Sequence, residues 1–398
     1  MLILSATVLL TAALAVPAAA QPPPHSNAPG AHVTNIAHRG ASGVAPENTL
    51  GAVEAAMGTG ADLVEVDVQR SADGVLVTMH DTTLTRTTNV EEIFPDRDSY
   101  ALADFTFAEL RQLDAGSWFD ESFAGEPIPT LDDIIGALPA GMGLLLEVKS
   151  PELYPGLAED IAQALAAWPG LVNANPRAQR LVVQSFDWDF IRLYHELQPN
   201  VAVGLLGGPP SDEELVEFSS FVDQINPSHT AIEAAAIQRI QELGMTVNVY
   251  TVNDPERMAE LIDLGVDGII TNYPALLTDV LRGGPGVDPD TVAITSVLGN
   301  GPGSDVAYGA GEYVAITNLS DAPVDVSDWY LRDNAYNRLD IGDGYVLDPD
   351  ETLQVHSGPG DDSDSQYFND RTGSILNNGG DTVILYAPDN TVEDVFTY

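Results

Sequence analysis

The stretch ADLVEVDVQRSADGVLVTMH, residues 61–80, contains two strand-like runs that are separated only by RSADG. Both runs, LVEVDVQ (63–69) and VLVTMH (75–80), are rich in β-branched residues, which favour strands. Runs of the same kind recur along the chain at 33–38, 143–149, 181–186, 201–206, 245–252 and 267–271. Strands that are apolar on both faces and alternate with helical segments are typical of a parallel sheet.

Eight such strands in about 250 residues predict a (β/α)8 barrel. The helical patterns expected around it cover 49–59, 107–113, 157–168, 188–197, 231–243 and 255–264. RSADG is too short to hold a crossover helix, so the predicted barrel is irregular. Residues 82–142 are too many for a plain loop and predict an inserted subdomain over the barrel mouth.

The ends of the chain have a different character from the barrel. An apolar run followed by Ala18–Ala20 and QPPP predicts a signal peptide over 1–20, a linker over 21–31, and export to the cell surface or beyond. After the predicted barrel (32–283) and a Gly- and Pro-rich linker (284–290), the sequence has short alternating runs and turn residues. This pattern predicts an all-β, immunoglobulin-like sandwich over 291–398.

Composition excludes several classes of function. The 398 residues include 60 acidic and 15 basic ones, for a formal net charge of −45. Such a surface repels nucleic acid, and the dispersed acidic residues are typical of a protein that works in high salt. The absence of cysteine excludes disulfides, thiolate nucleophiles and cysteine-based zinc sites.

Polar side chains mark the ends of the first four predicted strands. In a parallel barrel the carboxyl ends of the strands meet on one face, where catalytic groups lie. Residues two apart on a strand also point to the same side. We therefore expect one cluster at this face, made of His38, Arg39, Glu65, Asp67, His80, Glu147 and Lys149.

The expected cluster contains the groups that phosphodiester cleavage requires. Three converging carboxylates repel one another unless a cation lies between them, and an all-oxygen set favours Ca²⁺ or Mg²⁺. Arg39 and Lys149 supply positive charge for a phosphate, and His38 and His80 can transfer protons near neutral pH. Lys149 is the only lysine of the chain, which argues against a casual surface role for it.

HRGASGVAPENTLGAVEAAMGTGADLVEVDVQRSADGVLVTMHDTTLTRTT (38–88), LLLEVK (144–149) and GVDGIITNYP (265–274) together resemble the glycerophosphodiester phosphodiesterase family. The resemblance extends over roughly residues 33–282. It implies a divalent metal and cleavage of small glycerophosphodiesters to sn-glycerol 3-phosphate and an alcohol. It also implies an acid/base pair (His38, His80), metal ligands (Glu65, Asp67, Glu147) and phosphate contacts (Arg39, Lys149).

Two positions depart from the family pattern. Tyr250 stands where the family often has Trp, and its ring is expected to form a wall for the substrate. Asn272 stands where the family often has Asp, which removes one negative charge. Asn48 in PENT is a candidate hydrogen-bonding residue at the same wall, although a turn-stabilising role competes with it.

The sequence leaves two candidates for the first nucleophile of the implied reaction. It is either water or the glycerol 2-hydroxyl of the substrate.

The C-terminal part is similar to the lamin-tail domain, through EYVAITNLSDAPVDVSDWYLRD (312–333) and ILNNGGDTVILYAPDNTVED (375–394). Such a module on an exported hydrolase suggests extracellular attachment through the sandwich.

Two other functions compete with the main hypothesis. One is a phospholipase D-like enzyme acting on intact phospholipids or lysophospholipids, and the other is a non-catalytic extracellular binding protein. Head-group preference and oligomeric state do not follow from the sequence.

Overall fold

The computed structural model describes residues 32–172, 180–282, 291–299, 305–333, 337–376, 382–388 and 391–398. The predicted signal peptide and both predicted linkers, 1–20, 21–31 and 284–290, lie outside these residues. Within the described ranges, no helix has the length and apolar character needed to span a membrane.

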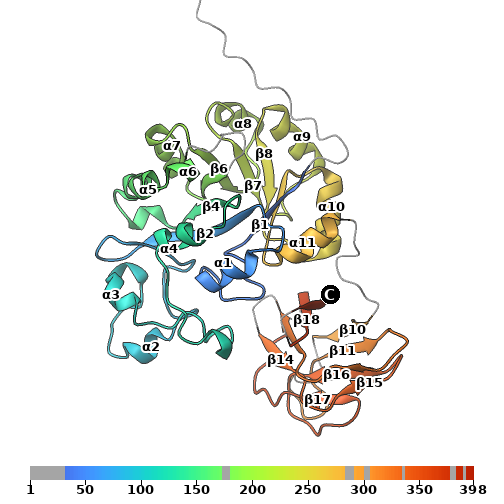
Figure 1. Ribbon diagram of the computed structural model, residues 1–398. Coiled ribbons are helices and arrows are strands. Elements are labelled where there is room, and N and C mark those ends of the chain that lie inside the picture. The colour runs from blue at the N-terminus through green and yellow to red at the C-terminus, as the bar shows by residue number, and fades with distance from the viewer. Residues whose placement is uncertain are drawn as a thin grey trace, which may run out of the picture.

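Eight parallel strands close into a barrel with helices around its outside (Figure 1). The strands are β1 (Thr34–Ala37), β2 (Leu63–Arg70), β4 (Gly143–Val148), β5 (Leu181–Ser185), β6 (Ala202–Gly207), β7 (Gln224–Pro227), β8 (Thr246–Val249) and β9 (Gly268–Thr271). Strand β1 pairs in parallel with both β2 and β9, which closes the sheet. The predicted (β/α)8 fold is confirmed.

The prediction was wrong about one barrel strand. The run at 75–80 forms β3 (Leu76–Thr78), which pairs antiparallel with β2 and lies outside the parallel barrel. RSADG is therefore a hairpin turn and not a shortened crossover. The eighth barrel strand is β7, QINP, which the prediction missed because Gln, Asn and Pro are poor strand formers. Its Asn226 side chain is buried and donates a 2.8 Å hydrogen bond to Gln184 Oε1.

Several barrel helices begin at a residue whose side chain caps them. Thr49 accepts a hydrogen bond from Ala52 N at 3.2 Å, and Asp187 accepts one from Phe190 N at 2.9 Å. The helices are α1 (Leu50–Ala56), α4 (Leu131–Ala137), α5 (Leu157–Ala166), α6 (Pro169–Val172), α7 (Trp188–Leu197), α8 (Asp212–Phe218), α9 (Ala234–Glu242), α10 (Pro255–Leu264) and α11 (Pro274–Leu281).

The segment between β3 and α4 has a small core of its own. It contains the short helices α2 (Val90–Ile93), η1 (Leu102–Asp104), α3 (Phe107–Leu110) and η2 (Glu121–Phe123). Its fully buried side chains include Leu84, Leu102, Phe105, Leu110 and Ile128. The connection from β2 to β4 thus consists of a hairpin strand, this subdomain and the crossover helix α4.

The C-terminal part is an all-β sandwich. One sheet has the order β10 (Val292–Leu298), β11 (Tyr313–Asn318), β16 (Thr352–His356), β17 (Gln366–Phe368). The other has the order β14 (Arg338–Asp340), β13 (Tyr330–Asp333), β18 (Thr382–Tyr386), β19 (Val392–Thr397). The short ribbon β12 (Val324–Asp325) and β15 (Val346–Leu347) completes it. Buried Val314, Ile316, Leu331, Leu353 and Leu385 form part of its core.

Candidate active site

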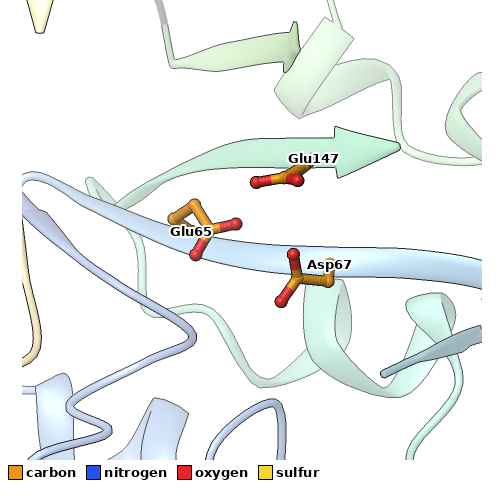
Figure 2. A group of neighbouring side chains, drawn as sticks. All are labelled: Glu65, Asp67 and Glu147. Carbon is orange, nitrogen blue, oxygen red and sulfur yellow. The ribbon is translucent and has the colours of Figure 1, made fainter. Parts of the chain in front are cut away.

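Three carboxylates from two neighbouring strands converge at the carboxyl end of the barrel. Glu65 and Asp67 lie on β2, and Glu147 lies on β4 opposite Asp67 in the register. One oxygen atom from each lies within 4.8 Å of the others, and Figure 2 shows the three groups gathered between the two strands. Oε1 of Glu65 and Oδ1 of Asp67 are buried and lack a hydrogen-bond partner in the part of the chain that the structure describes.

The electrostatics of this triad favour a bound cation. Burial, and next the charges of Asp67 and Glu147, raise the pKa of Glu65 well above its ordinary value. Burial and Asp67 likewise raise the pKa of Glu147. These carboxyl groups therefore bind protons more readily without a cation, and a divalent ion would compete with those protons. Two buried oxygen atoms without a hydrogen-bond partner and an all-carboxylate donor set fit a hard cation such as Ca²⁺ or Mg²⁺.

Lys149 lies at the edge of the triad. Its Nζ donates a 2.6 Å hydrogen bond to Glu147 Oε1 and lies 3.8 Å from Asp67 Oδ1. Burial opposes the charge of the ammonium group, but Asp67 and Glu147 outweigh burial and raise the pKa of Lys149. The only lysine of the chain is thus a fixed positive charge beside the candidate metal ligands.

Arg39 also contacts the triad, from the second position after β1. Its backbone N donates a 2.8 Å hydrogen bond to Glu65 Oε2, and its Nε lies 3.3 Å from Asp67 Oδ2. Its Nη1 donates to Glu47 Oε1 at 2.9 Å. The residue has a left-handed backbone, with φ of 54°. This uncommon conformation turns the backbone N–H and the guanidinium toward the carboxylates.

His38 is held in one orientation by an amide. Its Nδ1 lies 2.7 Å from Asn272 Oδ1, which can only accept, so Nδ1 carries the hydrogen. Its Nε2 lies 4.0 Å from Glu65 Oε2 and faces the site. Burial, followed by the charge of Arg39, lowers the pKa of His38 to about 3. His38 is therefore a neutral imidazole with Nε2 available to accept a proton.

His80 approaches the site from the hairpin and not from a barrel strand. Its Nδ1 lies 2.6 Å from Asp81 Oδ1, and the other oxygen of Asp81 accepts a 2.6 Å hydrogen bond from Arg86 Nε. The hydrogen bond from His80, and next Arg86, hold the pKa of Asp81 well below its usual range despite partial burial. The Nδ1 atom of His80 is thus occupied by Asp81, and Nε2 is the atom available to a substrate.

The roles of three residues at this site, Glu47, Asp81 and Asn272, were not predicted from the sequence. Glu47 is buried and pairs with both Arg39 and Arg86, whose Nη2 donates to Glu47 Oε1 at 2.7 Å. Burial raises the pKa of Glu47, but the two guanidinium groups outweigh it and the net shift is downward. Asp81 and Asn272 fix the two imidazoles. The glutamate in PENT and the His-Asp pair at 80–81 were visible signals, but Glu47 pairs with Arg86 and His38 with Asn272 across 39 and 234 residues of sequence.

A cavity of about 210 Å³ brings six of the seven predicted residues together. Its lining comprises His38, Arg39, Glu65, His80, Glu147, Lys149, Gln184, Phe186, Leu206, Tyr250, Thr251 and Ile270. The seventh, Asp67, lies behind Lys149 and Arg39, within contact of both. A larger, more open cavity of about 710 Å³ adjoins it and shares Glu147, Lys149 and Phe186.

The two predicted wall residues have different places. Tyr250 lines the smaller cavity, with its ring edge-to-face against Phe186 at 5.9 Å between centroids. Asn48 does not line it. Its side chain is buried, donates to Asp67 Oδ2 at 2.8 Å and accepts from Asp67 N at 2.9 Å. The structure therefore places Asn48 behind a candidate metal ligand, where it orients Asp67.

Two family models match the chain and together cover most of it. The model of the Glycerophosphoryl diester phosphodiesterase family matches residues 38–276, which include every residue of the site. The model of the Lamin Tail Domain matches residues 287–398, which include the described strands of the sandwich.

Individual relatives agree with the first family model. The chain is 35% identical over 254 residues to a glycerophosphodiester phosphodiesterase of Caldanaerobacter subterraneus, covering 63% of this chain and 98% of the relative. It is 33% identical over 264 residues to one of Bacillus subtilis, covering 63% and 87%. A solved phosphodiesterase of Oleispira antarctica, in complex with the product sn-glycerol-3-phosphate, superposes with a TM-score of 0.53 and 31% identity, covering 63% of this chain and 96% of that one.

Proposed function

Because the chain belongs to the glycerophosphoryl diester phosphodiesterase family, we propose that it hydrolyses glycerophosphodiesters to sn-glycerol 3-phosphate and an alcohol. One arrangement carries the proposal. Two carboxylates, two cationic side chains and two imidazoles line one small cavity, and the third carboxylate, Asp67, contacts both cationic side chains. The product named in the Oleispira antarctica complex is the one this reaction would release.

The triad of Glu65, Asp67 and Glu147 would hold a divalent cation. When bound, that ion would supply positive charge to a phosphate oxygen and lower the barrier to attack on phosphorus. Arg39 and Lys149 each contact Asp67 and line the same cavity, so that both could bind a phosphate placed there. Asn48 keeps Asp67 in place through two hydrogen bonds.

The two imidazoles have different tasks in the proposed reaction. His38 is neutral and keeps its hydrogen on Nδ1, so its Nε2 would take the proton of the attacking hydroxyl, whether this is water or the glycerol 2-hydroxyl. His80 would give a proton from Nε2 to the leaving alcohol oxygen. Its orientation is set by Asp81 and, through Asp81, by Arg86.

The head group of the substrate would lie in the larger cavity. Phe186, 52% exposed, stands where the two cavities meet and leaves an apolar ring face for the alcohol part. The aromatic residues of segment 82–142 do not add an apolar lip for intact lipid. Phe105 and Phe119 are buried, and Phe94, Phe107, Trp118 and Phe123 are partly buried. This observation favours water-soluble diesters over membrane lipids as substrates.

We also propose that the enzyme acts outside the cytoplasm. The support is the apolar run at 1–20 with its Ala-rich end, which has the form of an export signal. Fractionation of cells that express the chain with and without residues 1–20 tests this, and retention of both forms in the cytoplasm would contradict it.

The activity is tested by glycerol 3-phosphate release from glycerophosphocholine. The chain without its first 20 residues is stripped with EDTA in about 2 M KCl, where exposed charges are screened within a few ångströms. Ca²⁺ or Mg²⁺ is then restored. We expect release only with metal, loss of release in His80→Ala, and retention in His32→Ala, whose side chain is 73% exposed and outside the site.

The competing functions predict other results. Choline release from lysophosphatidylcholine, with none from glycerophosphocholine, would favour the phospholipase D-like enzyme. No cleavage of either substrate by a folded protein, with any metal, would favour a binding protein.

A further inference from the structure

The outer face of one sandwich sheet is covered by the barrel. Along β18, Val383 and Leu385 point into the sandwich core, whereas Ile384 and Tyr386 belong to the hydrophobic core of the barrel. All four are fully or nearly fully buried. A strand that is apolar on both faces needs a layer on each side, because successive side chains alternate. Figure 1 shows β18 on the side of the barrel where α11 and α1 lie.

Polar contacts give this interface a defined orientation. Arg332 is 2% exposed, and its Nη2 donates a 3.0 Å hydrogen bond to the carbonyl oxygen of Phe119. Its guanidinium lies 3.8 Å from the Phe119 ring centroid and 3.7 Å from Asp120 Oδ2. Arg338 pairs with the same carboxylate. Two of the 15 basic residues of the chain thus contact Asp120. Because basic side chains are so few, a chance surface contact is a poor explanation for this pairing.

A further contact reaches the loop that follows β1 and carries His38. The hydroxyl of Tyr386 donates a 2.9 Å hydrogen bond to the carbonyl oxygen of Gly43, and both groups are buried. The Tyr386 ring is stacked on Tyr330, with 4.8 Å between centroids and 8° between planes. The loop is packed too closely for any side chain at 43, since a Cβ there would lie 2.0 Å from the Tyr273 ring.

The same loop backbone is bonded to the residue that orients the imidazole. Gly43 N donates a 3.0 Å hydrogen bond to the carbonyl oxygen of Asn272, whose side chain holds His38 Nδ1 at 2.7 Å. Ser42 Oγ donates to the carbonyl oxygen of His38 at 2.7 Å. Tyr386 is therefore linked to His38 through Gly43 and Asn272, although it belongs to the other domain.

We propose that Tyr386 is a positioning residue of the active site, by which the C-terminal sandwich fixes the loop after β1 and the imidazole of His38. The kinetic consequence of this inference rests on the proposed function. The sandwich is then part of the catalytic unit. Its outer sheet β14-β13-β18-β19 is occupied by the barrel and is not the face for extracellular attachment.

Two substitutions in the otherwise intact chain separate positioning from stability. Tyr386→Phe keeps the ring and its stacking but removes the hydroxyl. Arg338→Gln is the control, because it breaks an interdomain contact at Asp120 and removes a guanidinium that lies over Tyr330, but it keeps the Tyr386 hydroxyl that bonds to Gly43. We expect Tyr386→Phe to lower kcat about ten-fold or more with KM unchanged, since a misplaced base acts on the transition state. Arg338→Gln keeps kcat and loses thermal stability.

Amide hydrogen exchange of residues 38–49 tests the same inference without reference to activity. Tyr386→Phe is expected to speed exchange at the Gly43 amide and its neighbours, and Arg338→Gln is not. Unchanged exchange in Tyr386→Phe would overturn the inference. So would a fall in kcat that is equal in the two variants and follows their loss of stability. An inactive wild type would instead count against the proposed hydrolysis, and the exchange result would still decide the positioning role.

Discussion

The amide oxygen Oδ1 of Asn272 lies 2.7 Å from Nδ1 of His38. The amide orients the imidazole without adding a negative charge beside it. Burial and Arg39 therefore lower the pKa of His38 to about 3, and the neutral form is present throughout the neutral range. A base that is already deprotonated suits the first step of diester hydrolysis.

Replacing this amide by a carboxylate should change the pH dependence. In Asn272→Asp the new negative charge stabilises the imidazolium form and raises the pKa of His38. Because the base must be neutral, the acid limb of the profile of kcat/KM against pH moves to higher pH. The profiles of wild type and Asn272→Asp measure the shift. An unchanged acid limb in a folded variant would exclude His38 as the base.

Lys149→Arg tests whether charge alone is sufficient at this position. The ammonium group is within 2.6 Å of Glu147 Oε1 and 3.8 Å of Asp67 Oδ1, a space that a planar guanidinium does not match. We expect kcat to fall by about 10²–10³-fold, as for loss of a preorganised charge-stabilising donor. Arg192→Lys, at an exposed pair with Glu217, is the control. A kcat of Lys149→Arg close to that of the wild type would show that any positively charged side chain is sufficient at this position.

Metal binding at the triad should appear in thermal unfolding. Ca²⁺ or Mg²⁺ at about 100 times its Kd should stabilise the EDTA-treated protein by about 2.7 kcal/mol. Glu65→Gln should raise the Tm in EDTA, because it removes one of three buried repelling carboxyl groups, and should reduce the gain on adding metal. Glu233→Gln, an exposed position, should behave as wild type. A metal-induced gain that survives in Glu65→Gln would place the ion elsewhere.

The charge of the chain predicts a response to salt. With 60 acidic and 15 basic residues, the folded state is destabilised by self-repulsion that salt screens. The Tm should therefore rise as KCl increases from low to molar concentration. A Tm that is independent of KCl would remove the support for a protein adapted to high salt.

The hairpin after β2 shows how far the sequence could predict the site. The run at 75–80 was expected to be a barrel strand with His80 at its carboxyl end. In fact β3 runs antiparallel to β2 and returns the chain toward Asp67, whose carbonyl oxygen accepts a 3.0 Å hydrogen bond from Met79 N. His80 reaches the expected cavity by a different path. The parallel barrel was predictable because apolar strands alternate with helices.

Strand β7, the pairing of Glu47 with Arg86 and the layer that covers β18 could not be predicted, because they depend on contacts between residues that are distant in sequence. The strand QINP has one apolar residue, Ile225, which packs in the barrel core, and buried hydrogen bonds of Asn226 to neighbouring strands complete its place. Glu47 becomes a partner of Arg86 through folding of two loops that are 39 residues apart. The VILY run of β18 is apolar at successive positions, which indicates that both faces of the strand are covered. The barrel covers the second face, and Gly43, which accepts the hydrogen bond from Tyr386 there, is 343 residues away in the sequence.

The most direct test of the proposed reaction is to identify the products of glycerophosphocholine by phosphorus NMR, with and without EDTA. The proposed chemistry predicts a single new signal, that of sn-glycerol 3-phosphate, which appears with Ca²⁺ or Mg²⁺ and disappears in EDTA. Formation of phosphocholine, or glycerol 3-phosphate formation that persists after the metal has been removed, would contradict it.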